Sequence, residues 1–108
     1  MLLALSLWAM ASVAASQQTD VPAAEKQFRA WLTVFNAGDR VALQEFLLKN
    51  NPERAGHVDD DLRFRDMTGG FEFKKTEQSA PTKYVALLKE RGSDTFVRAT
   101  MEVEEVEP

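Results

Sequence analysis

The chain contains no cysteine, and its only histidine is His57. Without a thiol it can form no disulfide, zinc–thiolate site, lipid-anchoring thioether or cysteine nucleophile. A single imidazole also cannot make a multi-histidine metal site or a His–Cys catalytic pair. We therefore expect packing alone to stabilise the fold.

Sequence motifs that carry catalysis or phosphate binding are missing as well. Ser79 and Ser93 both stand in turn signals, and neither lies in G-x-S-x-G or S-x-x-K. The pair Gly69–Gly70 is not part of a P-loop or a dinucleotide-binding glycine motif. We expect no catalytic residue, no cofactor site and no metal site in this chain, so that it is not an enzyme by itself.

One acidic cluster is a candidate for binding a hard cation. Three consecutive aspartates, Asp59, Asp60 and Asp61, follow closely after His57. They lack the alternating spacing and the glycine of a calcium-binding loop, so we expect a solvated loop. Arg63 and Arg65 lie just beyond and could together clamp an anion, although pairing with nearby acids is the simpler role.

The charge balance is mildly acidic and evenly spread. Thirteen basic and seventeen acidic residues give a formal net charge of −4. A nucleic-acid-binding domain would need a basic stripe, which the sequence lacks. We expect an ordinary soluble surface and no nucleic-acid partner.

The first fifteen residues, MLLALSLWAMASVAA, carry no charge and end in small residues. This pattern is typical of a secretory signal peptide, cleaved after Ala14 or Ala15. It is shorter than the roughly 20 apolar residues that a membrane-spanning helix needs. We therefore expect a periplasmic or secreted protein without a stable membrane anchor. Residues 16–20 are polar and predict a flexible lead-in, which leaves residues 21–108 for a single domain.

Apolar periodicity predicts helices in the first half of that domain. From about Val21, apolar residues recur at helical spacing in one stripe, formed by Ala24, Phe28, Trp31, Leu32 and Phe35. Asn36 and Gly38 are suited to the left-handed conformation that ends a helix. Asp39 is a good cap for a second helix that runs to about Lys49 and stops before Pro52. Asp59 or Asp60 could cap a short third helix that runs through Met67.

After Gly70 the period changes to two. Strands are expected at residues 71–78, 84–88 and 95–103, and the middle one is apolar on both sides and hence central. Helices followed by consecutive strands predict an α+β fold. Two or three helices would pack on one face of a three-stranded, or four-stranded, antiparallel meander.

The predicted last strand leaves an open question at the edge of the sheet. An exposed edge is normally covered or blunted. The acidic residues of EVEEVEP, at residues 102–108, could blunt it. Alternatively, the domain is truncated at Pro108, or a partner covers the edge.

Two family resemblances add to this interpretation. The segment FRAWLTVFNAGDRVALQEFL, Phe28 to Leu47, resembles the opening helices of cystatin-like α+β domains related to nuclear transport factor two. The ordered set FNAGDR, FRDMTGGF, SAPT and LLKERGSD is similar to the small N-terminal region of certain bacterial exported serine hydrolases, both beta-lactamase-like and tail-specific peptidase types. The second resemblance implies a periplasmic accessory domain whose catalytic serine lies in another domain.

The leading hypothesis is a non-catalytic exported domain that works by contact. It would dock on a hydrolase domain or pair with a second copy through the sheet edge. The alternative is a ligand-binding or enzymatic domain with a pocket between helix and sheet. Five residues are the candidates to line that pocket: Trp31, Phe35, Arg63, Arg65 and Tyr84.

Overall fold

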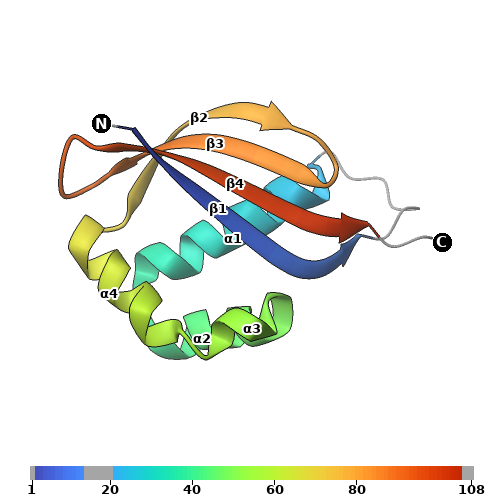
Figure 1. Ribbon diagram of the computed structural model, residues 1–108, viewed down its shortest axis with the longest axis horizontal. Helices are drawn as coiled ribbons and strands as arrows, with labels where there is room; N and C mark the ends of the chain where they lie inside the picture. Colours follow the sequence, from blue (N-terminus) through green and yellow to red (C-terminus); the bar gives the residue numbers. More distant parts are fainter. Residues whose placement is uncertain (1, 14–20, 106–108) are drawn as a thin grey trace.

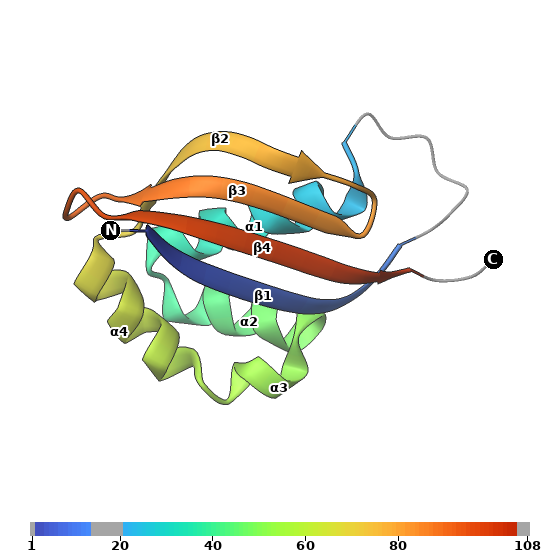
Figure 2. The same ribbon diagram turned by 45° about the horizontal axis from the view of Figure 1, so that its top comes forward.

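The computed structural model describes residues 2–13 and 21–105. Its elements in chain order are β1 (Leu2–Val13), α1 (Ala23–Ala37), α2 (Arg40–Asn50), α3 (Pro52–Ala55), α4 (Val58–Thr68), β2 (Phe71–Ser79), β3 (Lys83–Glu90) and β4 (Phe96–Glu105). Within these two ranges, the four helices lie together on one side of the sheet, and no helix covers its other side (Figures 1 and 2). The predicted α+β fold is confirmed.

The sheet has the strand order β1-β4-β3-β2. Strands β2, β3 and β4 form the predicted antiparallel meander, with the apolar strand β3 in the middle. The fourth strand, β1, pairs with β4 in the parallel direction, so the sheet is mixed. Its parallel direction corrects the expectation that a fourth strand would extend an antiparallel meander. A strand from the far end of the chain is free to add in either direction, because no tight hairpin connects it to β4.

The segment expected to be a signal peptide forms β1 in this structure. It lies along the outer side of β4 and also approaches α1 and α2 (Figure 2). Alternation of Leu3, Leu5 and Leu7 with smaller residues suits a strand as well as a leader. Cleavage after Ala14 or Ala15 stays a prediction, and the expected lead-in at 16–20 lies outside the described residues.

Local sequence explains the first two helices. Gly38 ends α1 in the left-handed conformation, with φ of 69°, and its N–H donates to the Phe35 carbonyl. The Asp39 carboxylate accepts hydrogen bonds from the N–H groups of Val41 and Ala42 and so caps α2. Both capping predictions are confirmed for these two residues. Asn36, by contrast, lies within α1 and has no positive φ, so it is not a helix-ending residue.

The region after α2 is more helical than expected. Pro52 opens the short helix α3, where its fixed φ is tolerated in a first turn. His57 stands at the N-terminal boundary of α4, and its side chain makes no capping hydrogen bond. The prediction that Asp59 or Asp60 caps this helix was wrong, because both lie inside its first turn. There the aspartates face the positive end of the helix dipole.

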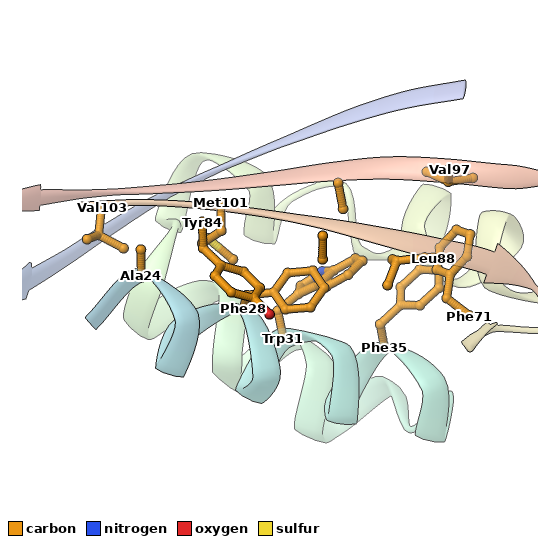
Figure 3. Packing of buried hydrophobic residues seen from close by; sticks show 12 residues of the cluster. Ala24, Phe28, Trp31, Phe35, Phe71, Tyr84, Leu88, Val97, Met101 and Val103 are labelled. Atoms are coloured by element: carbon orange, nitrogen blue, oxygen red, sulfur yellow. The ribbon is translucent and has the colours of Figure 1, made fainter. Parts of the chain in front are cut away.

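The main core lies between α1 and the sheet (Figure 3). Phe28 and Trp31 of α1 are at most 6% exposed, and Tyr84 on β3 is fully buried. Aromatic contacts run the length of the helix: the Phe28 and Tyr84 rings are 5.2 Å apart, and the Trp31 and Phe35 rings stack at 5.0 Å. The predicted helical stripe is therefore the surface that joins helix to sheet.

A second, smaller cluster joins the helices to one another. Leu43 and Leu47 of α2 pack with Ala55 and Val58 in this cluster. Phe46, on the same helix, is partly buried against both clusters. The helices α2 to α4 therefore form a layer that is attached to the main core through α1, through Phe46 and, from α4, through Phe64, whose ring contacts Phe35 and Phe71.

Truncation of Trp31 tests the importance of the main core. We expect Trp31→Ala to lower the free energy of unfolding by about 3–5 kcal/mol, because it leaves a large cavity against the sheet. Leu48→Ala is the matched control, since Leu48 is 58% exposed on α2, and it should change stability by less than about 0.5 kcal/mol. Urea denaturation followed by circular dichroism measures both values. Equal effects of the two substitutions would contradict the assignment of Trp31 to the core.

Candidate functional site

Three of the four segments FNAGDR, FRDMTGGF, SAPT and LLKERGSD meet at one corner of the fold, where α1 and α4 end and β2 begins, and SAPT is the exception. The side chain of Asn36 spans this corner. Its Nδ2 donates to the Phe71 carbonyl at 2.9 Å, and its Oδ1 accepts from the Phe71 N–H at 2.8 Å. The amide thus holds both backbone groups of the first residue of β2. We call this set of contacts around Asn36 the Asn36 corner.

Glycines let the backbone pass through the Asn36 corner. Gly70 has a φ of +90°, and a Cβ atom built on it would lie 2.8 Å from Asn36 Oδ1. Gly69 has a φ of +77° and packs against the backbone of Gly92 in the β3–β4 turn. That turn is bonded to the end of α4, because the Gly92 N–H donates to the Thr68 carbonyl at 2.9 Å. The segments FNAGDR, FRDMTGGF and LLKERGSD therefore form one structural joint.

Arg65 completes the Asn36 corner from α4. Its Nε and Nη2 donate to the Asn36 carbonyl oxygen at 3.2 and 2.9 Å. A guanidinium group is well placed there, because the carbonyl groups at the C-terminus of α1 carry partial negative charge. Arg63 points elsewhere: its side chain is 70% exposed and pairs with Asp60. The structure therefore does not bring these two arginines together in the way that an anion clamp requires.

The aromatic candidates for a pocket lie in the main core. Trp31 and Phe35 stack on each other, and Phe35 stacks in turn on Phe71 at 5.4 Å. Tyr84 is fully buried against Phe28, and its hydroxyl group forms a 2.5 Å hydrogen bond with the Thr76 hydroxyl. All three side chains thus have packing partners, and the polar atom of Tyr84 is already satisfied.

The acidic cluster is also engaged with basic side chains. Arg40 pairs with Asp59 and Arg54 with Asp61, while Asp60 lies near both Arg63 and His57. The hydrogen bond from Arg40 lowers the pKa of Asp59 below its ordinary value. The expectation of a solvated loop was wrong in its geometry, because the three aspartates lie on a helix. Among the described residues, no group of three or more His, Cys, Asp or Glu side chains is arranged to hold a metal ion.

The outer face of the sheet carries both apolar and charged side chains, and an ion pair cross-links it. Arg98 on β4 reaches across β3 and donates to Glu77 on β2 at 2.5 Å. This hydrogen bond lowers the pKa of Glu77 and raises that of Arg98. The pair therefore ties together the outer surfaces of strands that are not adjacent in the sheet.

The two edge strands of the meander, β2 and β4, differ in how regularly they pair with β3. On the β2 side, the register with β3 shifts twice, between Phe73 and Lys75 and between Thr76 and Gln78. Irregular pairing and lysine side chains are devices that discourage strand addition at an edge. On the β4 side, the register with β3 is unbroken from Lys83↔Glu102 to Lys89↔Phe96, and β1 occupies the edge.

Sequence reasoning did not assign the roles of Asn36 and Arg65. A polar side chain at a helix end predicts a local cap, whereas the partners of Asn36 and Arg65 are 35 and 29 residues away. The occurrence of asparagine and two glycines at element boundaries was the available signal. It could indicate tight backbone geometry but not which boundaries meet.

No family model, curated protein or solved structure matches the chain. In the part of the chain that the structure describes, no helix is long and apolar enough to cross a membrane.

Alanine substitution of two glycines tests the geometry of the Asn36 corner. We expect Gly70→Ala to destabilise the protein by about 1–3 kcal/mol from its positive φ alone, and by more if the new Cβ displaces Asn36. Gly56→Ala is the matched control, because Gly56 has a φ of −73° and open space around it. It should be neutral or stabilising by up to about 1 kcal/mol. Thermal and urea unfolding of both variants give the comparison, and equal stability of the two would contradict the described corner.

Proposed function

We propose that the chain is an exported, non-catalytic interaction domain that contacts a serine hydrolase domain in the periplasm. The hydrolase would be either a further part of the same protein or a separate polypeptide. The observation that carries this proposal is the structural role of the motif residues. Asn36, Gly69 and Gly70 all lie in the Asn36 corner, where they connect the helices to the sheet. The residues that carry the resemblance to hydrolase N-terminal regions therefore have a structural role in this chain, which supports a scaffold more than a catalyst.

The distribution of side chains supports a role in contact. The pocket candidates Trp31, Phe35 and Tyr84 are packed in the core, where they stabilise the domain. The Arg65 guanidinium donates to the Asn36 carbonyl at the end of α1, and Arg63 forms an ion pair with Asp60. The surfaces left for an interaction are the outer face of the sheet, its long sides and the outer side of the helices, where Leu48 and Met67 are exposed. No observation favours the alternative function, a pocket between helix and sheet.

The predicted leader can be tested directly. We expect the exported protein to begin at Ala15 or Ser16, because small residues precede both bonds. Intact-mass measurement of the protein recovered from the periplasm or medium distinguishes the two. A variant with Ala14→Arg and Ala15→Arg, in which both small residues are replaced, should accumulate uncleaved. Recovery of an exported unaltered chain that still carries residues 2–13 would contradict the leader.

The contact with a hydrolase is tested by photo-crosslinking in the native host. A photoreactive amino acid replaces one exposed side chain at a time, at Leu48, Met67 or Phe96. We expect irradiation to yield an adduct that a fluorophosphonate probe also labels, since this probe reacts with activated serines. If the hydrolase belongs to the same polypeptide, antibodies against the domain will detect a larger, labelled protein without irradiation.

Controls separate catalysis from contact. The purified chain alone should not react with the fluorophosphonate probe, and labelling of the chain would contradict its non-catalytic role. Samples that are not irradiated report background association. Absence of any labelled adduct from all three positions, together with absence of a larger labelled protein, would overturn the proposal.

A further inference from the structure

The edge of β4 carries a long and regular strand contact. The pairing of β1 with β4 runs from Leu2↔Phe96 to Ala9↔Val103 without interruption. After one shift it continues with Ser12↔Glu104 and Val13↔Glu105. An edge that pairs over this length presents its backbone N–H and C=O groups in straight register, as strand addition requires.

The side chains on the helix-facing surface of β4 are apolar. Val97, Ala99 and Met101 are at most 2% exposed, and they belong to the main core. The strand β1 lies beside them and also approaches α1 and α2 (Figure 2). Any strand in this place therefore has the β4 backbone on one side and the helical layer beneath it.

We propose that, once the predicted leader has been removed, the edge of β4 is a strand-accepting site. Its occupant is an extended segment of the partner hydrolase with apolar residues at every second position. This inference rests on the proposed function, because it names the surface through which the contact is made. Removal of β1 would leave the unpaired backbone of β4 and the neighbouring core in contact with water, and a partner strand restores both interactions.

The segment that now fills the site indicates the chemistry of the occupant. Leu3, Leu5 and Leu7 hold the register positions beside Val97, Ala99 and Met101. Between them Ser6, which is exposed, stands beside Thr100. The alternate positions of β1 hold Ala4, Ser6 and Trp8. The occupant therefore needs apolar residues beside the buried residues of β4, and its alternate positions accept polar as well as apolar residues. Residues 2–13 also carry no charge, which suits a strand over a buried core.

The opposite side of the meander is a weaker candidate for strand addition. The β2 edge has two register shifts, and its exposed residues include Lys74 and Lys75. Both features oppose the approach of another strand. The inference is therefore specific to the β4 side.

The experiment starts from the folded full chain and opens the edge in place. A specific protease site replaces residues 16–20. Cleavage there breaks the covalent link between β1 and the rest of the chain, while the β1 segment stays in the sample. The probe is a fluorescent peptide with the sequence of residues 2–13, and binding is followed by fluorescence anisotropy. We expect the cut chain to bind the probe at least about tenfold more tightly than the uncut chain, because a tethered strand competes at high effective concentration.

Two control peptides test the chemistry of the site. A peptide with Leu5→Pro and Ser6→Pro cannot complete the ladder, because one of two adjacent N–H groups faces the neighbouring strand. A peptide with Leu3→Lys, Leu5→Lys and Leu7→Lys would place charges in the helix-facing register. We expect at least a tenfold loss of binding for each. Binding equal to that of the unaltered probe would overturn the proposal.

A disulfide lock tests the position of the site. The chain has no cysteine of its own, so Ser6→Cys with Thr100→Cys can form only one intramolecular disulfide across this register pair. The oxidised, cut chain should not bind the probe, and reduction should restore binding. Probe binding that is unaffected by oxidation, or failure of the disulfide to form, would place the strand elsewhere and overturn the inference.

Stability measurements keep the test valid if the cut chain is fragile. A peptide that fills the site raises the melting temperature in proportion to the logarithm of its concentration, and no rise with the unaltered probe counts against the site.

Three further outcomes separate the possible occupants and the two proposals. If light scattering shows that the cut chain forms dimers and the probe does not bind, the occupant is a second copy of this chain, and the proposed partner strand is wrong. Labelled hydrolase adducts that form equally with the oxidised lock would preserve the proposed function and overturn this inference alone. Probe binding without any hydrolase adduct would preserve the strand-accepting edge and overturn the proposed function.

Discussion

Contact between the aromatic side of α1 and the sheet is the interaction on which the rest of the fold depends. Phe28, Trp31 and Phe35 each bury nearly their whole side chain there. The rings also contact one another, so the helix is attached along its length and not at a single point. Because a cysteine-free domain has no covalent cross-link, this apolar surface must supply most of the favourable free energy of folding.

The Asn36 corner gives that contact a defined orientation. Apolar packing is non-directional, whereas the paired hydrogen bonds between Asn36 and Phe71 align the end of α1 with the start of β2. At the other end of α1, the Ala24 N–H donates to the Pro81 carbonyl in the β2–β3 turn at 3.1 Å. The helix is thus held by polar contacts at both ends and by hydrocarbon between them. A helix that is held at both ends in this way fixes the position of the sheet, which suits a contact made along the β4 side, as proposed above.

Much of the architecture could be predicted because it depends on local periodicity. The α1 stripe, the cap at Asp39 and the left-handed Gly38 are all decided by neighbours within a few residues, and the structure confirms them. Errors arose where two local signals competed. Asp59 and Asp60 look like caps, yet α4 begins one residue earlier at Val58 and places them in its first turn. Residues 2–13 satisfy both a leader pattern and a strand pattern, and periodicity cannot rank a cleavage signal against a strand.

The sequence by itself determined that helices precede the antiparallel strands β2, β3 and β4, and it also determined the apolar stripe of α1 and the motifs that the chain lacks, because each of these is a property of residue type and spacing. Only the tertiary structure decided that Asn36 bonds to Phe71, that Arg65 binds the end of α1 and that β1 pairs with β4. The reason is physical. These contacts join residues 29 or more positions apart, and which segments meet depends on how the whole apolar surface is buried.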